Sequence, residues 1–484
     1  MTDHPKNIHL LGICGTAMAA LAGILQAQGC RVTGSDEHVY PPMSDHLRRL
    51  GIAFSEGYRP ENIPAEADLV VVGNVIREVN PEAAEMRRRG LPYLSMAEAV
   101  QRFAIRGRYT VAVVGTHGKT TTTSLLAHVL VEAGADPGFL IGGIARNFGS
   151  NFRAGSGRYF VIEGDEYDTA YFDKTPKFFK YRPSGLIFTS LEFDHADIYP
   201  DLDAIRAQFA ALLAGLPAEG LVVACADQPD VKALLSRCAC PVVTYGFEPG
   251  ADCRIEGWQA LGTGAAFVTA WRSETLSWRV PLPGRHNALN AAAVLLMARH
   301  LGQAPERIQA AFSTFLGVKR RQEVRGEAAG VTVLDDFAHH PTAVRETLSA
   351  VRAAYPGRRL WAVFEPRSFT ARSPRFQAQW PGAFAGADRV AIAPAFKTAG
   401  RPDGAAGSSR KRSDRAAGGS EYLDTQALAA AVRALGIPAV SPDSNDALLD
   451  YLAAEARTGD VMLMMSNGGF DNLHERLLAA LGKP

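Results

Sequence analysis

Residues 110–134 read TVAVVGTHGKTTTTSLLAHVLVEAG, and this stretch decides the fold of the chain. Residues 110–114 are rich in valine and end at Gly115, which predicts a buried strand of a parallel sheet. After Lys119, leucine and valine recur at helical spacing. A strand, a glycine turn and a helix in this order place free backbone N–H groups and the positive end of a helix dipole around a phosphate group. The stretch therefore predicts a phosphate-binding loop in an α/β fold.

The phosphate loop departs from the strict pattern G-x-x-x-x-G-K-[ST], which requires glycine where the chain has Val113. The loop is instead the shorter run Gly115-Thr116-His117-Gly118-Lys119-Thr120. We expect Lys119 to hold the terminal phosphates of a nucleotide, and the hydroxyl group of Thr120 or Thr121 to bind Mg²⁺. A glycine turn in front of an ordinary surface helix is the structural alternative.

Length, charge and cysteine content limit the class of protein. A chain of 484 residues predicts about three domains. The net charge of +1 gives no electrostatic reason to expect nucleic acid or an anionic membrane as a partner. The six cysteines include Cys238 and Cys240, but no second pair at zinc-like spacing, so we expect free thiols in a reducing compartment. Without an N-terminal signal or an apolar run of about 18 residues, the prediction is a cytoplasmic protein.

The first residues resemble the start of a nucleotide-binding domain. Residues 7–36 read as an apolar strand, a turn from Gly12 to Gly15, an alanine-rich helix and a second strand that ends at Asp36. An acid at this place meets a ribose hydroxyl group in dinucleotide-binding folds. However, Cys14 and Ala17 replace the second and third glycines of G-x-G-x-x-G. Nucleotide binding and a plain strand-to-helix turn therefore both remain open.

Composition changes along the chain predict the domain boundaries. Residues 101–108, QRFAIRGR, are basic and show no periodicity, so a first domain should end there. A third domain should begin after Leu316. Within it, residues 399–420, AGRPDGAAGSSRKRSDRAAGGS, have the composition of a mobile loop. The predicted domains are therefore residues 1–106, 107–316 and 317–484.

Acidic side chains follow two predicted strands of the second domain. The first strand, residues 159–162, leads into Glu163, Asp165, Glu166 and Asp168, and the second, residues 186–189, leads into Glu192, Asp194 and His195. Ligands bind at the carboxyl ends of parallel strands, and these side chains beside a lysine loop suggest Mg²⁺ ions that also contact phosphate. A solvated turn for the first group and a structural role for His195 remain as alternatives.

Six motifs in order carry a resemblance over nearly the whole chain: GTHGKTTTT, EGDEYD, LEFDHADIY, GRHNALNAAAV, GVKRRQE and DDFAHHPTAV. In this order they resemble the Mur ligases, ATP-dependent enzymes that form amide bonds in bacterial cell-wall synthesis. The resemblance implies an α/β fold of three domains: a Rossmann-like UDP-binding domain, a central P-loop ATPase-like domain and a C-terminal Rossmann-like domain. The C-terminal domain would bind the peptide substrate and close over ATP.

Other segments narrow the resemblance within the family. The segments GICGTAMAALA and VTGSD are similar to members that act on UDP-N-acetylmuramate. The segments YPPMSDHL, IGGIARNFGSNF and MMSNGGF are similar to members that attach recycled L-alanyl-γ-D-glutamyl-meso-diaminopimelate to that sugar nucleotide. The implied substrates are UDP-N-acetylmuramate, a short peptide and ATP, with Mg²⁺ as cofactor. Three alternatives stay open: the ligase that adds only L-alanine, a folylpolyglutamate synthase, and a P-loop switch that is not an enzyme.

The resemblance also implies roles for single residues. Lys119, Glu163, His195 and Arg321 would act in catalysis, and Thr120, Glu163 and His195 would hold Mg²⁺. The ATP contacts would be the loop residues 115–121 with His286, Asn287, Asn290, Arg321 and Asp336, the last on the ribose. Gly12, Gly15 and Asp36 would contact the UDP-sugar.

Two further expectations concern the ligands of Mg²⁺ and the residues that bind the peptide. Several Mur ligases use a carbamylated lysine as a further Mg²⁺ ligand, but no lysine occurs between Lys180 and Lys232, so we expect that ligand to be absent. Arg367, Arg372 and Arg375 are the candidates for binding the carboxylates of a peptide. They could equally lie on a solvated helix face, just as Asn287 and Asn290 could be turn or N-cap residues.

Overall fold

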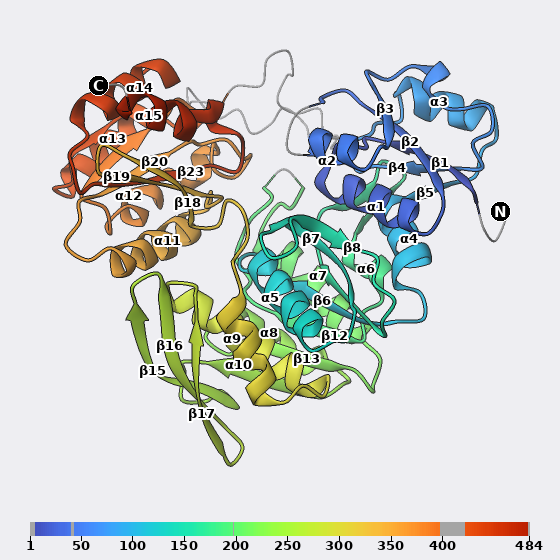
Figure 1. Cartoon of the computed structure of the whole chain (residues 1–484), viewed down its shortest axis with the longest axis horizontal. Helices are drawn as coiled ribbons and strands as arrows, with labels where there is room; N and C mark the ends of the chain where they lie inside the picture. Colours follow the sequence, from blue (N-terminus) through green and yellow to red (C-terminus); the bar gives the residue numbers. More distant parts are fainter. Residues whose placement is uncertain (1–4, 40–42, 197, 397–421, 483–484) are drawn as a thin grey trace.

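The computed structural model describes residues 5–39, 43–196, 198–396 and 422–482. The described residues form three large sheets with helices on their faces (Figure 1) and a separate two-stranded sheet at residues 168–176. The predicted α/β class is therefore confirmed. The loop predicted at residues 399–420 lies outside the described residues.

The N-terminal sheet has the strand order β3-β2-β1-β4-β5, and all its neighbouring strands run parallel. This is the Rossmann strand order without its sixth strand, in agreement with the predicted Rossmann-like domain. Its elements are β1 (Asn7–Leu11), α1 (Thr16–Ala27), β2 (Arg31–Asp36), α2 (Met43–Arg49), β3 (Ala53–Glu56), β4 (Leu69–Val72), α3 (Pro81–Arg88), β5 (Tyr93–Ser95) and α4 (Met96–Val100), with a 3₁₀ turn at Pro60–Asn62.

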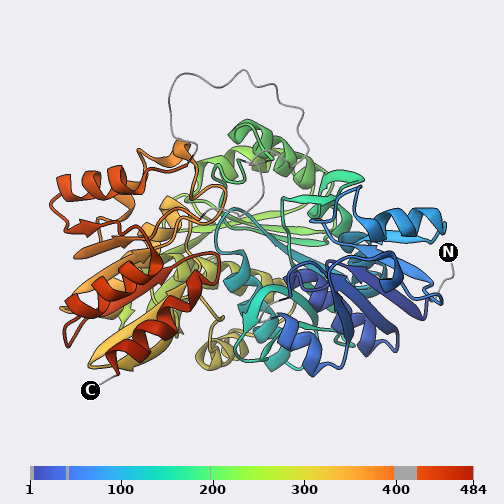
Figure 2. The same ribbon diagram turned by 90° about the horizontal axis from the view of Figure 1, so that it is seen from above.

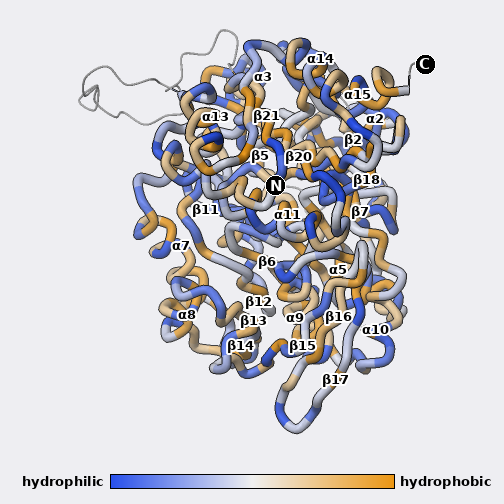
Figure 3. The backbone as a smooth tube through the Cα atoms, turned by 90° about the vertical axis from the view of Figure 1, so that its left-hand side faces the viewer, coloured by the Kyte–Doolittle hydropathy of each residue, from blue (hydrophilic) through white to orange (hydrophobic). Residues whose placement is uncertain are grey.

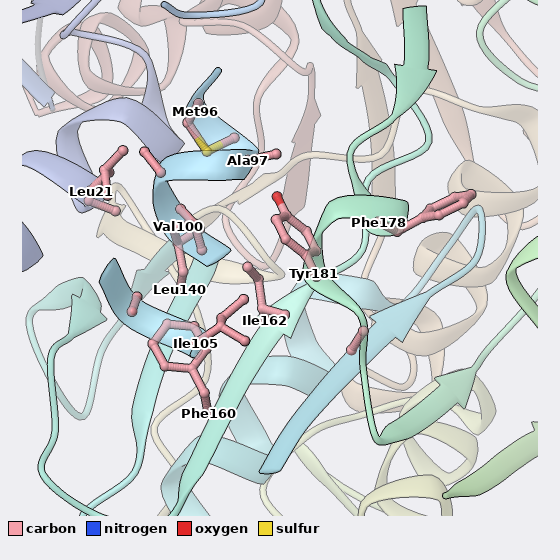
Figure 4. Packing of buried hydrophobic residues seen from close by; sticks show 14 of the residues in the cluster. Leu21, Met96, Ala97, Val100, Ile105, Leu140, Phe160, Ile162, Phe178 and Tyr181 are labelled. Atoms are coloured by element: carbon pink, nitrogen blue, oxygen red, sulfur yellow. The ribbon is translucent and has the colours of Figure 1, made fainter. Parts of the chain in front are cut away.

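The segment at the end of the N-terminal domain differs from the prediction. Residues 101–108 were expected to be non-periodic, but a π-helical turn at Gln101–Ile105 continues α4. The reason is packing: Ala104 and Ile105 are buried in a cluster shared by α1, α4 and the central sheet. Figure 4 shows Leu21 and Val100 on one side of this cluster and Leu140 and Phe160 on the other. The connection is thus part of the core.

The central sheet is the largest, with the order β17-β16-β15-β14-β13-β12-β6-β9-β7-β8. Its middle strands are parallel. In β6, Val111 and Val113 pack under α5, α9 and α10, whereas Ala112 and Val114 face α7 and the N-terminal domain. The predicted strand at residues 110–114 is buried on both faces, which its unbroken apolar sequence requires.

The bounds of the central elements are β6 (Tyr109–Val114), α5 (Lys119–Glu132), β7 (Gly138–Ala145), β8 (Ser150–Arg153), β9 (Tyr159–Glu163), β10 (Asp168–Ala170), β11 (Asp173–Pro176), α6 (Phe178–Tyr181), β12 (Gly185–Phe188), α7 (Leu202–Ala214), β13 (Leu221–Cys225), α8 (Pro229–Leu234), a 3₁₀ turn (Leu235–Arg237), β14 (Val242–Gly246), β15 (Cys253–Leu261), β16 (Gly264–Trp271), β17 (Glu274–Val280), α9 (Arg285–His300) and α10 (Pro305–Thr314). Strands β15 to β17 form an antiparallel arm that projects from the edge of the sheet, with a hydrophilic tip (Figure 3).

The C-terminal sheet has the order β18-β19-β23-β20-β21-β22, parallel except for β18. Helices α11 to α13 cover one face, and α14 and α15 cover the other. The elements are β18 (Glu323–Ala328), β19 (Val331–Asp336), α11 (Pro341–Ala354), β20 (Leu360–Phe364), α12 (Trp380–Ala383), β21 (Arg389–Ile392), α13 (Thr425–Ala434), β22 (Ala439–Val440), α14 (Asn445–Glu455), β23 (Val461–Met465) and α15 (Leu473–Leu481), with 3₁₀ turns at Pro374–Phe376 and Phe470–Asn472.

The N-terminal and C-terminal sheets lie on opposite sides of the central part (Figure 2). The strands of the N-terminal sheet precede residue 106, those of the central sheet lie between residues 106 and 316, and those of the C-terminal sheet follow residue 316. The division of the chain at these two positions stays a prediction. Among the described residues, no helix combines the length and the apolar character needed to cross a membrane.

The contact between α1 and β8 leads to a prediction about stability. A Cβ atom on Gly23 would lie 2.0 Å from the ring of Phe152 in β8, so the two domains meet where α1 has no side chain. We expect Gly23→Ala to lower the free energy of unfolding by about 1–3 kcal/mol, the usual cost of overpacking. Denaturant unfolding followed by tryptophan fluorescence and circular dichroism would measure it.

The matched control is Gly382→Ala in α12, where no described atom lies within 4 Å of the added Cβ. This change should be neutral or stabilise by up to about 1 kcal/mol. Adding Phe152→Ala to Gly23→Ala removes the clashing ring and should recover part of the loss beyond the cost of Phe152→Ala alone. Equal stability of Gly23→Ala and the control would contradict the contact.

Candidate functional site

One large cleft of about 1770 Å³ is lined by residues of all three domains. Gly15 from the N-terminal domain, Lys119 from the central domain and Arg321 from the C-terminal domain are among its walls. The carboxyl ends of β6, β9 and β12 open into it, as expected for a parallel α/β sheet.

The phosphate loop is held in place by close contacts that only glycine permits. Gly115 has a φ of +123°, and a Cβ atom there would lie 2.5 Å from the hydroxyl oxygen of Thr189. Gly118, the N-cap residue of α5, has a φ of +81°, and its Cβ would lie 2.6 Å from Oδ1 of Asn290. The backbone N–H of His117 also donates to Oγ of Ser190 at 2.8 Å. The loop therefore docks between the end of β12 and helix α9.

Lys119 is paired within the cleft. Its Nζ donates to the carbonyl oxygen of Gly115 at 2.5 Å and lies 3.3 Å from the carboxylate of Glu166. Burial alone would lower the pKa of Lys119, but the nearby carboxylates, Glu166 first, outweigh it and raise the pKa. Lys119 is therefore a fixed positive charge at the N-terminus of α5, where phosphate groups bind.

Glu166 also pairs with His195. Nε2 of His195 lies 2.9 Å from Oε1 of Glu166, whose side chain is only 3% exposed. Burial disfavours the charged histidine, but the hydrogen bond and charge of Glu166 outweigh it and raise the pKa of His195 to about 9. The solvated-turn alternative is thus wrong for Glu166. The expected Mg²⁺-binding role of His195 remains a prediction, and it would require the loss of this proton.

Thr120, Glu163 and Arg321 meet at one point, and the roles that the resemblance implies for them stay predictions. The hydroxyl group of Thr120 donates to Oε2 of Glu163 at 3.1 Å, and Nη2 of Arg321 donates to the same hydroxyl oxygen at 3.3 Å. The other oxygen of Glu163 accepts from the backbone N–H of Gly142. Burial raises the pKa of Glu163 despite its neighbours Lys119 and Arg321.

The donor set at this point fits Mg²⁺, because a hydroxyl and a carboxylate oxygen are ligands that this ion prefers. Thr120 and Glu163 lie next to each other on the wall of the cleft, beside the start of α5. Arg206 in α7 pairs with Asp203 and Asp230 on the surface, and the expected absence of a carbamylated lysine ligand remains a prediction. Thr121 also lines the cleft.

The turn that carries Arg321 depends on Asp336. The two oxygens of Asp336 accept the backbone N–H groups of Gln322 at 2.8 Å and Ala338 at 2.7 Å. Arg320 and Gln322 on either side of Arg321 have φ values of +61° and +51°. Asp336 thus braces the turn, while its expected contact with a ribose remains a prediction.

His286, Asn287 and Asn290 lie together at the start of α9 and line the cleft. Nδ2 of Asn290 donates to Oδ1 of Asn287 at 3.1 Å, and Nδ2 of Asn287 donates to the carbonyl oxygen of Pro283 at 2.7 Å. The N-cap alternative is wrong for both asparagines, because Gly284 occupies that position. Burial lowers the pKa of His286 to about 4, so its imidazole is neutral.

The three residues expected to contact the UDP-sugar differ in whether they line the cleft. Gly15 lines the cleft together with Cys14 and Thr16, whereas Gly12 and Asp36 are absent from the described lining residues. Asp36 instead accepts the backbone N–H of Cys14 at 2.9 Å, and so shapes the turn before α1.

The three arginines expected to bind a peptide also differ in whether they line the cleft. Arg367 lines the cleft, stacks on the ring of Phe396 at 3.9 Å and lies 3.6 Å from Glu365. Arg372 donates to the carbonyl oxygen of Phe396 at 3.2 Å, and the exposed Arg375 to that of Pro200 at 3.4 Å. Neither is among the described residues that line the cleft.

Sequence reasoning missed a second cluster on the cleft wall, formed by His117, Glu192 and His340. Oε2 of Glu192 lies 3.2 Å from Nε2 of His117 and 3.3 Å from Nδ1 of His340. Burial, helped by His117, lowers the pKa of His340 to about 4. The two histidines come from motifs far apart in the sequence, so only their spatial proximity reveals the cluster.

Comparisons with known proteins agree along the whole chain. Residues 7–108 match the family described as Mur ligase family, catalytic domain, residues 113–298 the Mur ligase middle domain, and residues 320–468 the Mur ligase, glutamate ligase domain. The UDP-N-acetylmuramate--L-alanyl-gamma-D-glutamyl-meso-2,6-diaminoheptandioate ligase of Escherichia coli is 37% identical, over 99% of this chain and 98% of that protein. The UDP-N-acetylmuramate--L-alanine ligase of Myxococcus xanthus is 36% identical, over 99% and 96%.

Solved structures of ligases with related names also match this chain over nearly its whole length. A murein peptide ligase from Psychrobacter arcticus has a TM-score of 0.73 and 33% identity, with 99% of both chains covered. The UDP-N-acetylmuramate-alanine ligase of Thermotoga maritima has a TM-score of 0.77 at 24% identity, over 98% of this chain and 99% of that one, which shows a shared fold.

The phosphate loop yields a first prediction for this site. Lys119→Ala removes the fixed charge beside the N-terminus of α5, and a charge-assisted contact contributes about 1.5–3 kcal/mol. We expect calorimetry to show ATP binding weakened about 10- to 100-fold. Lys174→Ala, which removes an exposed lysine paired with Asp168, is the matched control and should leave ATP binding unchanged. ATP binding unaffected by Lys119→Ala would refute the assignment of the loop.

The contact between Thr120 and Glu163 yields a second prediction. Glu163→Gln keeps the shape of the side chain but removes the anionic oxygen that Mg²⁺ prefers. The Mg²⁺ concentration that half-saturates the Mg²⁺-dependent part of ATP binding should rise at least about 10-fold, since even mutation of residues that support a metal ligand costs that much. The exposed Glu219→Gln serves as control. An unchanged Mg²⁺ titration would exclude Glu163 as a ligand.

Proposed function

The chain belongs to the Mur ligase family of ATP-dependent amide ligases, and from that premise we propose that it acts in cell-wall peptide recycling as a murein peptide ligase. The reaction joins the lactyl carboxylate of UDP-N-acetylmuramate to the amine of L-alanyl-γ-D-glutamyl-meso-diaminopimelate. ATP is converted to ADP and phosphate.

The observation that carries this proposal is the meeting of Thr120, Glu163 and Arg321. Two of these residues belong to the central domain and one to the C-terminal domain, and a single hydroxyl group joins them. Lys119 directly precedes Thr120 in the phosphate loop. Two cationic side chains beside a carboxylate and a hydroxyl group are what phosphoryl transfer needs, because its catalysis consists of positioning and charge neutralisation.

The chemistry explains why ATP is required. A carboxylate does not condense with an amine at neutral pH, so the γ-phosphoryl group is first transferred to the carboxylate oxygen, which gives an acyl phosphate and ADP. The amine nitrogen then attacks the acyl carbon, loses a proton, and inorganic phosphate leaves as the amide forms. Thr120 and Glu163 would hold Mg²⁺, which neutralises phosphate charge when bound.

The pairs around Glu166 prepare Lys119 for this role. When Lys119 turns from Glu166 to a phosphate group, Glu166 keeps a cationic partner in His195, whose pKa of about 9 leaves it protonated at neutral pH. No buried carboxylate is then left without a partner, which would cost several kcal/mol.

The three-domain cleft fits an intermediate that water would destroy. An acyl phosphate hydrolyses unless water is excluded. Arg321 reaches Thr120 from the C-terminal domain, so this contact forms only when the C-terminal domain lies against the phosphate loop. Domain closure would thereby link water exclusion to the completion of the charge cluster.

Of the three candidate arginines, we propose Arg367 as the one that binds a carboxylate of the peptide substrate. Its side chain is about one-third exposed and lines the cleft, where a peptide carboxylate can pair with the guanidinium group. The similarity of IGGIARNFGSNF and MMSNGGF noted above and the relatives of 37–38% identity named for the tripeptide reaction also support the recycling reaction.

The second candidate function is the addition of L-alanine to UDP-N-acetylmuramate. The reason to keep it is that relatives with this name, such as the Myxococcus xanthus ligase, are 36% identical over nearly the whole chain. A folylpolyglutamate synthase does not account for the match of residues 7–108, and a non-enzymatic switch does not fit a family of ligases.

The choice between the two amines can be measured. With ATP, Mg²⁺ and UDP-N-acetylmuramate fixed, kcat/KM for the tripeptide should exceed that for L-alanine by up to about 10⁴-fold, because the smaller substrate leaves buried polar partners unpaired. Phosphate release and mass analysis of the product would give both values. If L-alanine is joined as fast as the tripeptide, the biosynthetic ligase replaces the recycling enzyme.

Arg367 can be tested in the same assay. Arg367→Ala should raise KM for the tripeptide about 10-fold or more and leave KM for ATP nearly unchanged, since a charged hydrogen bond contributes about 1.5–3 kcal/mol. Arg375→Ala changes an arginine of the same segment that does not line the cleft, and it should have little effect. If both variants raised KM for the tripeptide equally, the assignment of carboxylate binding to Arg367 would be contradicted.

A further inference from the structure

The His117–Glu192–His340 cluster has no role in the reaction proposed above, beyond the place of His117 in the phosphate loop. Its ligand atoms, two imidazole nitrogens and one carboxylate oxygen, all lie within 4.8 Å of one another. The side chain of His340 is 5% exposed, whereas those of His117 and Glu192 are about a quarter exposed. All three line the cleft, so an ion from solvent can reach them.

The hydrogen bonds of His340 indicate which of its nitrogens carries the hydrogen. Nε2 lies 3.3 Å from the carbonyl oxygen of Phe193, which can only accept, so Nε2 carries the hydrogen. Nδ1 is then unprotonated, and its single lone pair accepts the backbone N–H of Thr342 at 3.4 Å, the N-cap contact of α11. A cation at Nδ1 would compete with this long hydrogen bond for the lone pair.

This arrangement places two electron-rich atoms against each other. Nδ1 of His340 and Oε2 of Glu192 are 3.3 Å apart, and neither carries a hydrogen to share. Nε2 of His117 approaches the same carboxylate oxygen at 3.2 Å. A cation placed among the three atoms would turn this repulsion into three attractive contacts.

The spacing and the donor types indicate the kind of cation. Tetrahedral Zn²⁺ with ligand distances of about 2.0–2.1 Å has ligand atoms about 3.3 Å apart. The two distances to Oε2 of Glu192, 3.2 and 3.3 Å, match this spacing. Two imidazoles favour Zn²⁺ and similar transition metals, whereas Mg²⁺ prefers an all-oxygen set. The ring of His340 is also held in orientation, because its Nε2–H donates to the carbonyl oxygen of Phe193, as is usual for a histidine that binds a metal.

We propose that His117, Glu192 and His340 form a transition-metal site of the Zn²⁺ type, separate from the Mg²⁺ position at Thr120 and Glu163. The fourth position of the metal faces the cleft and is open to water or to an oxygen atom of a bound substrate.

The position of the ligands gives this site a structural consequence. His117 and Glu192 belong to the central domain, and His340 to the C-terminal domain at the start of α11. A bound metal therefore ties the two domains together beside the phosphate loop. Binding should favour the conformation in which Arg321 contacts Thr120, because both contacts need the same approach of the C-terminal domain.

The test uses the purified full chain, freed of metal by chelation, without nucleotide or Mg²⁺. Co²⁺ is titrated in and followed by visible absorption, because tetrahedral Co²⁺ absorbs far more strongly than octahedral Co²⁺, and Zn²⁺ is then added as competitor. We expect one equivalent of tetrahedral Co²⁺ that Zn²⁺ displaces. Glu192→Gln and His340→Gln should each weaken Co²⁺ binding at least about 10-fold, as the loss of a ligand exceeds the cost of losing a supporting residue.

Two histidine variants complete the design. His300→Gln, which changes a histidine that pairs with Tyr109 away from the cleft, should bind Co²⁺ as the unchanged protein does. His195→Gln tests the other histidine and carboxylate pair of the cleft, and it should also keep the tetrahedral spectrum. Glu192→Gln leaves the N-cap of α11 intact, so it tests the site even if His340→Gln unfolds.

The proposal is overturned if the unchanged protein does not bind Co²⁺ stoichiometrically, or binds it with an octahedral spectrum only. It is also overturned if Glu192→Gln binds as tightly as the unchanged protein, or if only His195→Gln loses the ion. Because no substrate enters the measurement, a failure here says nothing against the ligase reaction, and a failed ligase assay says nothing against the metal site.

Discussion

The close packing of the phosphate loop is the constraint on which the site depends. A side chain at position 115 would collide with Thr189, and one at position 118 would collide with Asn290. Because both positions are glycine, the loop can contact the end of β12 and helix α9 at the same time. This double contact brings the ends of β6, β9 and β12 and the start of α9 to one place. Lys119 and Thr120 then project from a rigid position, and the carboxylates of β9 are placed relative to them.

The contribution of the C-terminal domain depends on a strained turn. Arg320 and Gln322 adopt positive φ values, which cost a non-glycine residue about 1 kcal/mol or more each. Asp336 offsets this cost by accepting the N–H of Gln322, and the result is that Arg321 points at Thr120. Strain at such a turn is typical of functional sites, where the backbone must present one side chain in one direction.

Buried charges in the cleft occur in chains, and this limits what each can do alone. Lys119, Glu166 and His195 form one chain. Removing Glu166 would leave Lys119 and His195 without their shared negative partner, and an uncompensated buried charge costs about 3–5 kcal/mol. Glu192 belongs to a separate group with His117 and His340.

The sequence alone determined the β6, loop and α5 unit, the α/β class and the family, because local periodicity, glycine placement and motif order are written along the chain. The resemblance carried by these motifs implied roles for Thr120, Glu163 and Arg321 toward ATP or Mg²⁺, and these stay predictions. The tertiary structure was needed to show that Glu166 is buried between Lys119 and His195, that residues 101–105 are helical, that Arg367 lines the cleft whereas Arg372 and Arg375 do not, and that three distant motifs bring His117, Glu192 and His340 together. The physical reason is that sheet order and domain contacts set the distances between remote segments, whereas a local sequence pattern specifies only its own segment.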